Sequence, residues 1–156
     1  MQQKPTIPDF TNIFSQKKPQ PILQLKKYGI LALLTELDGE LHFILTKRAA
    51  HVRQPGDICF PGGHQEKGED LKQTALRETE EELGIPIEQI RILGKSNYML
   101  TVYGGLIQPY IGIVSAQDYH SISCQLEEVA EVFTIPLAFF LEHPPEIHYM
   151  YWKADM

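Results

Sequence analysis

Glutamates are concentrated in one stretch of the sequence, residues 70–84, which reads DLKQTALRETEEELG. Its first aspartate is a favourable helix N-cap and its last glycine a common C-terminal stop, so a helix is predicted over 70–83. At about 100° per residue, Glu78, Glu81 and Glu82 fall within roughly a quarter turn of that helix. Three carboxylates on one side of a helix suit a hard divalent cation such as Mg²⁺, which prefers oxygen ligands.

This arrangement of charge is unfavourable unless something compensates it. Like charges three or four residues apart on a helix repel by about a few tenths of a kcal/mol per pair, and Arg77 alone cannot neutralise the surrounding carboxylates. A solvated, glutamate-rich helix face is the alternative interpretation. The glycine-rich entry FPGG at residues 60–63 favours a metal site, because it lets backbone carbonyls approach an ion closely. Residues predicted to pack the helix on a sheet are Ala75, Leu76, Thr79 and Leu83.

Other segments supply the elements that must position these carboxylates. Residues 28–47 contain two apolar runs around Asp38-Gly39, a strong signal for a β-hairpin. The arm at 1–22 is rich in proline and predicted to be extended, with a short helix over 9–16. Strands outnumber helices without regular alternation, so we expect an α/β fold with a mixed sheet covered by helices. Further expected elements are strands at 90–100, 106–114 and 129–133, a polar loop after 114, and a short helix after Pro136.

Composition excludes several classes of function. The 156 residues suit a single domain, and the net charge of −6 argues against a surface that binds nucleic acid. No segment has the apolar length of a signal peptide or a membrane span, so a cytoplasmic protein without a membrane partner is expected. Two cysteines, Cys59 and Cys124, lack the spacing of a structural zinc site. A homodimer is compatible with the sequence.

The spacing around the glutamates resembles the Nudix box. Gly63 is followed after five residues by Glu69, and after seven more by the run RETEEELGI at 77–85; only Thr79 departs, where a bulky aliphatic residue is usual. The resemblance implies an α/β/α sandwich, a Nudix domain over 23–156, and Mg²⁺- or Mn²⁺-dependent hydrolysis of a nucleoside diphosphate linked to another moiety. It implies these metal ligands: Glu78, Glu81, Glu82 and the Gly63 carbonyl.

Catalytic roles follow from the same resemblance. Water must lose a proton to attack a diphosphate, and a glutamate is the expected acceptor. Members of the family take this base from the box or from a separate loop, so Glu81, Glu82 and Glu128 are the candidates. Glu82 is favoured, and Glu128 is the distal alternative. Glu69 is expected to orient Arg77 and not to bind the metal.

The segment before the box resembles the signature of the coenzyme A pyrophosphatase branch of the family. Residues 44–63 read ILTKRAAHVRQPGDICFPGG; Ala49 stands where serine is usual, and one interval is a residue short. Lys47, Arg48 and Arg53 are candidate substrate-binding cations, since guanidinium groups bind phosphate oxygens in pairs. The resemblance implies cleavage of coenzyme A into 4′-phosphopantetheine and adenosine 3′,5′-bisphosphate. Alternatives are a pyrophosphatase for ADP-ribose, dinucleotides or damaged nucleotides, and a non-catalytic nucleotide-binding module.

Overall fold

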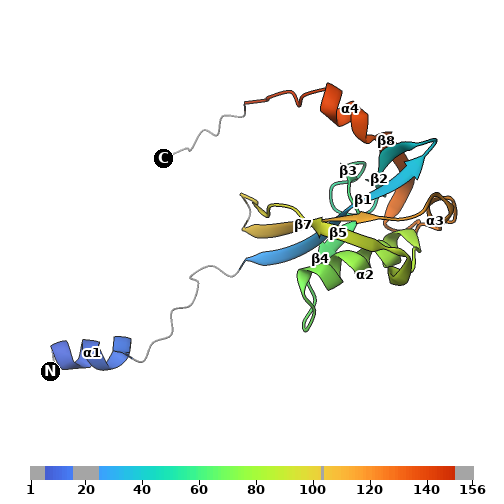
Figure 1. The fold of residues 1–156 in the computed structure, drawn as a ribbon. Helices are drawn as coiled ribbons and strands as arrows, with labels where there is room; N and C mark the ends of the chain where they lie inside the picture. The colour runs from blue at the N-terminus through green and yellow to red at the C-terminus, as the bar shows by residue number, and fades with distance from the viewer. Residues whose placement is uncertain (1–5, 16–24, 103, 150–156) are drawn as a thin grey trace.

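The computed structural model describes residues 6–15, 25–102 and 104–149, which form five helices and eight strands, shown in Figure 1. The helices are α1 (Ile7–Ser15), α2 (Leu71–Leu83), the short 3₁₀ helix η1 (Ile87–Gln89), α3 (Ala116–His120) and α4 (Leu137–Glu142). The strands are β1 (Lys26–Leu37), β2 (Glu40–Arg48), β3 (Ile58–Cys59), β4 (Gly62–His64), β5 (Arg91–Lys95), β6 (Met99–Leu100), β7 (Gly105–Ile113) and β8 (Val129–Pro136).

The strands form one mixed sheet whose central path runs β3-β2-β1-β7-β5. β1 and β7 are parallel, whereas the other paired strands are antiparallel. The predicted hairpin is confirmed: Leu37 pairs with Glu40, and both Asp38 and Gly39 have positive φ angles, as a tight two-residue turn requires. The α/β class and the mixed sheet are therefore confirmed.

The sheet divides where β1 and β2 separate. β1 pairs with β2 only from Leu33 onward, and its earlier residues Tyr28–Ile30 pair with β4. The far end of β2 pairs with β3 at Thr46 and Lys47. The FPGG segment at 60–63 therefore connects β3, which pairs with β2, to β4, which pairs with β1. This division places a glycine-rich backbone against the helix that follows.

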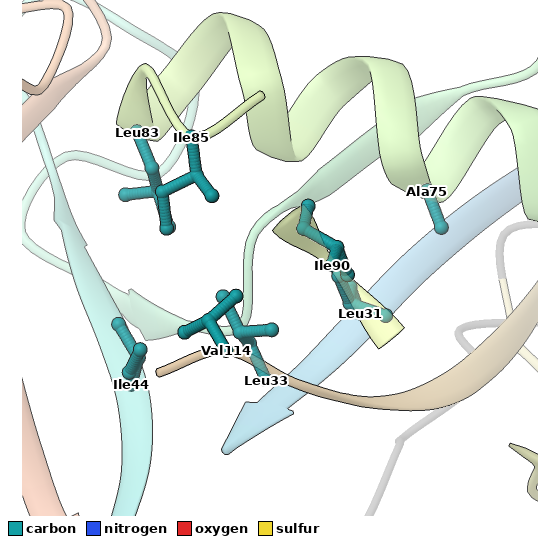
Figure 2. Packing of buried hydrophobic residues seen from close by; sticks show 8 residues of the cluster. All are labelled: Leu31, Leu33, Ile44, Ala75, Leu83, Ile85, Ile90 and Val114. Atoms are coloured by element: carbon teal, nitrogen blue, oxygen red, sulfur yellow. The ribbon is translucent and has the colours of Figure 1, made fainter. Parts of the chain in front are cut away.

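Helix α2 packs on one face of the sheet, as Figure 2 shows. Ala75 and Leu83 point from the helix toward Leu31 and Leu33 of β1, and all four side chains have no exposed area. Thr79 is also fully buried, and its hydroxyl donates to the Ala75 carbonyl at 2.7 Å. The helix itself satisfies that hydroxyl, so threonine is tolerated where a larger apolar residue is usual. Other core members are Ile44, Ile85, Ile90 and Val114.

Helix α4 lies against the opposite face. Phe43 of β2 forms edge-to-face contacts with Phe60 and with Phe140 of α4, at ring-centroid distances of 5.2 and 5.7 Å. The sheet thus lies between α2 and α4, which is the arrangement expected of an α/β/α sandwich.

Two expectations about secondary structure are wrong, and two short strands were not predicted. The single strand predicted over 90–100 is two strands, β5 and β6, and a register shift near Gly94 interrupts the pairing of β5 with β7. The polar loop after residue 114 contains α3, which Ser115 and Asp118 begin with a reciprocal capping box. The two strands that were not predicted are β3 and β4, which are only two and three residues long and are defined by pairing with β2 and β1.

The N-terminal arm contains a helix, as predicted, although its start differs. α1 begins at Ile7 instead of Asp9 and ends at Ser15. Pro8 lies in the first turn, where a missing amide donor costs no helical hydrogen bond. Gln16 and the predicted boundary between residues 22 and 23 lie outside the described residues, so the division into arm and domain stays a prediction.

The contact between α2 and β1 depends on glycine at position 29, which yields a test. A Cβ atom there would overlap the Leu71 carbonyl oxygen and lie 3.0 Å from the Ala75 nitrogen. We expect Gly29→Ala to lower the free energy of unfolding by about 1–3 kcal/mol, as overpacked sites do. Urea denaturation measures the loss. Gly94→Ala is the control, since its Cβ would meet no atom within 4 Å; equal stability losses in both variants would contradict the account.

Candidate metal-binding active site

Reciprocal hydrogen bonds fix the start of the glutamate helix. The Asp70 carboxylate accepts from the amides of Lys72 and Gln73, at 2.9 and 2.8 Å, and the Gln73 side chain accepts from the Asp70 amide at 2.7 Å. At the other end, Gly84 adopts the left-handed conformation with φ of 68°. The predicted N-cap and stop are both confirmed. The capping box satisfies amide groups at the start of the helix, and the packing of Ala75 and Leu83 in the core sets which way its carboxylates face.

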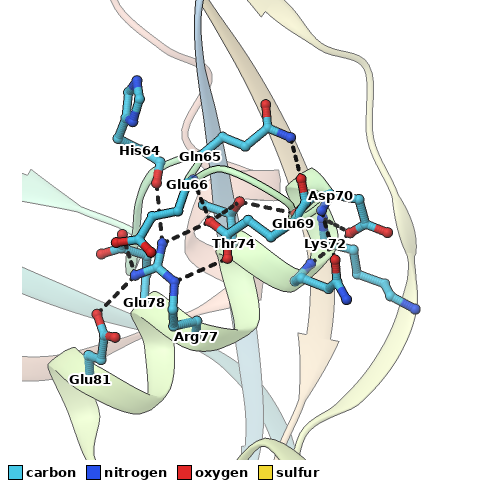
Figure 3. Close-up of polar contacts among 11 residues, drawn as sticks. His64, Gln65, Glu66, Glu69, Asp70, Lys72, Thr74, Arg77, Glu78 and Glu81 are labelled. Carbon is cyan, nitrogen blue, oxygen red and sulfur yellow. Dashed lines mark hydrogen bonds and ion pairs between the residues drawn. The ribbon is translucent and has the colours of Figure 1, made fainter.

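Arg77 gathers acidic side chains around one guanidinium group, as Figure 3 shows. Its Nε and Nη2 donate to the two oxygens of Glu69 at 3.1 and 3.0 Å. Its Nη1 lies 2.9 Å from Glu78 Oε1 and 3.0 Å from Glu81 Oε2, and Nη2 also donates to the His64 carbonyl at 3.2 Å. Arg77 therefore ties the helix to the loop before it, and Glu69 orients Arg77 as expected.

The charges in this network shift the titration of its members. Hydrogen bonding to Arg77 lowers the pKa of Glu69 to about 2, helped by bonds from the Glu66 amide and the Thr74 hydroxyl against the opposing effect of burial. The paired carboxylate of Glu69 raises the pKa of Arg77, to which Glu78 also contributes. Each shift favours the charged form of its group, so the pair is ionised at neutral pH.

Glu82 is the most buried glutamate of the helix, and no guanidinium group in the described ranges bonds to it. Only 6% of the residue is exposed, and one oxygen accepts from the Gly62 amide at 3.3 Å. Burial raises the pKa of Glu82 to about 7; the charges of Glu78 and Glu128 add to the rise, while the Gly62 bond and Arg48 oppose it. A buried carboxylate that lacks a bonded cation is costly unless an ion compensates it.

Glu78 stands between Arg77 and the glycines of β4. Burial raises its pKa against the effect of Arg77, and the charges of Glu81 and Glu128 raise it further. A Cβ atom on Gly63 would overlap the Glu78 carboxyl group. Glycine at 63 therefore lets this carboxylate approach β4 closely, whatever role the Gly63 carbonyl has.

The peptide groups of β4 alternate between β1 and the glutamates. Gly63 lies opposite Gly29 at a hydrogen-bonded position of the antiparallel β1–β4 ladder. Gly62, one residue earlier, faces away from β1, and its amide reaches Glu82. Between the two glycine carbonyls, the register favours Gly62 as an additional oxygen donor to an ion. Ligation by Gly63 stays a prediction.

The loop before β8 brings Glu128 to the same place. The Gln125 amide donates to the Glu82 carbonyl at 3.1 Å, and the Glu128 carbonyl accepts from the Ala49 amide at 2.9 Å. These bonds join the loop to the end of α2 and to Ala49, the residue after Arg48. The charge of Glu128 contributes to raising the pKa of both Glu78 and Glu82. The Glu128 side chain is therefore near enough to share a site with them.

The three cations proposed from the sequence are placed differently from one another. Arg48 is half buried, its Nε donates to the Arg53 carbonyl at 2.7 Å, and its charge acts on Glu82. Lys47 and Arg53 are exposed, and in the part of the chain that the structure describes neither side chain forms an ion pair or a hydrogen bond. Of the three, only Arg48 is brought beside the glutamates.

The carboxylate oxygens of the site are suitable ligands for a divalent cation, although the side chains do not converge on one point. Among the described residues, no three acidic, histidine or cysteine side chains are arranged to hold an ion. Glu78 and Glu81 instead turn toward Arg77, while Glu82 and Glu128 lie beside them without an ion pair. Oxygen donors with excess negative charge around a buried carboxylate are what Mg²⁺ or Mn²⁺ requires. Rotation of Glu78 and Glu81 away from Arg77 would complete such a site.

Two features of the site were missed from sequence. The first is the hydrogen bond from the Gly62 amide to Glu82, which follows from the β1–β4 register. The sequence of β4 is too short to be recognised as a strand. The second is Gly29, whose contact with α2 sets the height of the helix above the sheet; its only sequence signal is a glycine inside an apolar strand.

The ion pair between Glu69 and Arg77 predicts a pH dependence of stability. The folded pKa of about 2 lies below the ordinary value of 4.5, so the stabilisation is complete above about pH 4.5 and lost as pH falls toward 2. Glu69→Gln should therefore be less stable than the parent at pH 7, with the difference narrowing below pH 4.5. Thermal unfolding at stepped pH values measures it, with Glu66→Gln as the exposed control; a difference that is constant with pH would refute the assignment.

Comparison with known proteins gives consistent results for sequence and fold. The model of the NUDIX domain matches residues 25–146. Nudix hydrolase 3 of Caenorhabditis elegans is 36% identical over 70% of this chain and 47% of its own length, and peroxisomal coenzyme A diphosphatase NUDT7 of Mus musculus is 32% identical over 81% and 53%. The chain thus spans about half the length of these two relatives. An uncharacterized Nudix hydrolase NudL of Enterobacter is 34% identical over 91% and 77%.

Solved structures share the fold. An Ap4A hydrolase of Caenorhabditis elegans superposes with a TM-score of 0.64 at 22% identity, covering 76% of this chain and 85% of that one. The NUDIX domain of Shewanella oneidensis NrtR, crystallised with ADP-ribose, gives a TM-score of 0.59 at 25% identity, covering 86% and 87%. The glutamate helix, the mixed sheet and the match over 25–146 agree. The chain belongs to the Nudix family.

Proposed function

We propose that this chain is a Mg²⁺- or Mn²⁺-dependent coenzyme A diphosphatase, which yields 4′-phosphopantetheine and adenosine 3′,5′-bisphosphate. Nudix hydrolases cleave phosphoanhydride bonds and generally use divalent metal ions. The observation that carries the proposal is the buried, uncompensated carboxylate of Glu82 beside Glu78 and Glu128, with Arg48 at its edge. The identity of 32% to a coenzyme A diphosphatase supports this substrate over other diphosphates.

The proposed ligands are Glu78, Glu81 and Glu82 with one glycine carbonyl of β4. A bound divalent ion supplies charge neutralisation on the diphosphate and acidifies the attacking water. In the reaction a water oxygen forms a bond to one phosphorus, the P–O bond to the leaving phosphate breaks, and the water's proton passes to a carboxylate. Glu78 and Glu81 are paired with Arg77 in the ion-free site, and both carboxylates would rotate away from it to bind the ion.

We assign the general base to Glu82, with Glu128 as the alternative and Glu81 as a supporting ligand. Glu82 accepts a hydrogen bond from the Gly62 amide, which positions one of its carboxylate oxygens. Glu128 is exposed and comes from a separate loop, which leaves it free to approach a bound diphosphate. A base must come within hydrogen-bond reach of the water that it deprotonates, directly or through one further water.

Arg48 is the leading candidate for a substrate contact. Its Nε is used by the Arg53 carbonyl, so the two terminal nitrogens of its guanidinium remain for phosphate oxygens. Lys47 and Arg53 are exposed nearby and would add attraction for the anion at longer range. The Arg53 carbonyl also positions the Arg48 side chain. The backbone of Arg53 therefore contributes to substrate binding even if the Arg53 side chain does not.

The second candidate is an ADP-ribose pyrophosphatase. It is favoured by the similarity to the NrtR domain that was crystallised with ADP-ribose, and the glutamate site would serve either diphosphate equally. A non-catalytic nucleotide-binding module is less well supported, because all the glutamates of the box are present.

No helix in the described ranges is long and apolar enough to span a membrane. We propose a cytoplasmic location and leave the homodimer as a prediction.

A panel of diphosphate substrates tests this assignment. With Mg²⁺ or Mn²⁺ present, coenzyme A should be cleaved with a higher kcat/KM than ADP-ribose or diadenosine polyphosphates, and EDTA should abolish turnover. Chromatography of the products should show adenosine 3′,5′-bisphosphate. A preference above tenfold for ADP-ribose would move the assignment to the second candidate, and saturable binding without turnover at any metal concentration would favour the non-catalytic module.

A further inference from the structure

Gln54 lies in the loop between β2 and β3 and has a backbone conformation that its residue type rarely adopts. Its φ angle is 55°, in the left-handed region. Residues other than glycine are uncommon there, because the Cβ atom approaches neighbouring backbone atoms. Pro55, which follows, also favours extended backbone at the residue before it. A conformation that both residues disfavour persists only where the surrounding structure holds it.

Hydrogen bonds from this loop converge on Arg48, the last residue of β2. The Arg48 amide donates to the Asp57 carbonyl at 2.9 Å, and the Arg48 carbonyl accepts from the Gly56 amide at 3.1 Å. The Arg48 Nε donates to the Arg53 carbonyl at 2.7 Å. The loop therefore holds both the backbone and the guanidinium group of Arg48.

A tight turn closes the same loop after Gln54. The Asp57 amide donates to the Gln54 carbonyl at 3.3 Å. Pro55 and Gly56 occupy the two central positions of this turn, and φ of Gly56 is 78°, as is typical of a type II turn. The turn fixes the residues that follow Gln54. The peptide group before Gln54 is the one whose carbonyl reaches the guanidinium group of Arg48.

The φ angle of Gln54 helps to determine where the Arg53 carbonyl points. This carbonyl belongs to the planar peptide group that joins residues 53 and 54, which turns by rotation at ψ of Arg53 and φ of Gln54. Turning the group over would return Gln54 to an ordinary negative φ, and it would direct the carbonyl away from the Arg48 Nε. The hydrogen bond to Arg48 and the left-handed conformation of Gln54 therefore occur together.

Arg48 is the cation that this loop places beside the glutamate site. It is half buried, and its positive charge opposes the rise in the pKa of Glu82. The Gln54 side chain is exposed, and within the part of the chain that the structure describes it forms no hydrogen bond. The backbone of Gln54, and not its amide group, is therefore what acts on Arg48.

We propose that Gln54 is a positioning residue for diphosphate binding, because its left-handed backbone directs the Arg53 carbonyl to Arg48 and so fixes the guanidinium group. The inference rests on the proposed function, in which the terminal nitrogens of Arg48 contact the diphosphate. A guanidinium group that is already held at Nε loses less rotational freedom when phosphate oxygens bind. Gln54 itself is not a substrate contact.

Substitutions at Gln54 that differ in their tolerance of positive φ test the proposal. Gln54→Asn and Gln54→Gly keep the left-handed conformation accessible, whereas Gln54→Val disfavours it. Kinetics are measured with Mg²⁺ on whichever of coenzyme A and ADP-ribose the parent cleaves faster. Gln54→Val should raise KM about tenfold and change kcat less than about twofold, which is the pattern of lost substrate binding. The asparagine and glycine variants should stay within about threefold of the parent.

Asp38→Val is the matched control. Asp38 also has a positive φ, of 51°, but it lies in the turn at the opposite end of β2. Valine strains either turn, and only at position 54 should it raise KM. In an Arg48→Ala background, Gln54→Val should change KM less than about twofold, because the group that Gln54 positions is gone. An unchanged KM in Gln54→Val, or an equal increase in Gln54→Gly or Asp38→Val, would overturn the proposal.

The Arg48 Nε–H group allows a measurement that does not depend on turnover. Its NMR resonance is assigned by its loss in Arg48→Lys. This proton should exchange with water at least about tenfold more slowly in the parent and Gln54→Asn than in Gln54→Val, because only the first two keep its hydrogen bond. Gln54→Thr, which is also β-branched, replaces the valine variant should valine impair folding.

The exchange rates separate this proposal from the proposed function. If the proton exchanges slowly in the parent and neither diphosphate is cleaved, the proposed function fails and the positioning of Arg48 by Gln54 stands. If a diphosphate is cleaved but the proton exchanges equally fast in the parent and Gln54→Val, the positioning by Gln54 is overturned and the proposed function stands.

Discussion

The glutamate site depends on an imbalance of charge that one arginine only partly corrects. Arg77 contacts Glu69, Glu78 and Glu81 at hydrogen-bond distance, whereas no cation among the residues that the structure describes bonds to Glu82. Because Glu82 is buried, its charge is expensive in the absence of an ion. The fold tolerates that cost locally, and a bound divalent cation would remove it. Structure and proposed chemistry are thus linked through the same carboxylate.

The division of the sheet explains why the imbalance occurs at this place. β1 exchanges β2 for β4 along its length, and the glycines at 62 and 63 enter the sheet beneath α2. Glycine at 63 leaves room for Glu78, and glycine at 29 lets the helix approach β1. A side chain at 29 would push the helix away, and one at 63 would displace the Glu78 carboxyl group.

The sequence was sufficient for the elements whose signals are local. The hairpin at Asp38-Gly39, the N-cap at Asp70 and the stop at Gly84 all depend on residues within one turn, and all are confirmed. The two-residue strand β3 and the three-residue β4 depend on pairing with distant strands, which periodicity cannot reveal. For the site, the spacing of the glutamates predicted that Glu78 lies near Glu81 and Glu82, with which its charge interacts; their role as metal ligands stays a prediction. It could not predict that Glu78 and Glu81 turn to Arg77, since that depends on side-chain rotation.

Manganese binding in the absence of substrate tests the central claim most directly. Calorimetric titration of the parent and of Glu82→Gln, whose fold is checked by circular dichroism, isolates the buried carboxylate. The account predicts saturable Mn²⁺ binding by the parent and at least about tenfold weaker binding by the variant, since even outer-shell ligand partners contribute 10- to 100-fold. Equal affinity in the two proteins, or no binding by the parent, would contradict it.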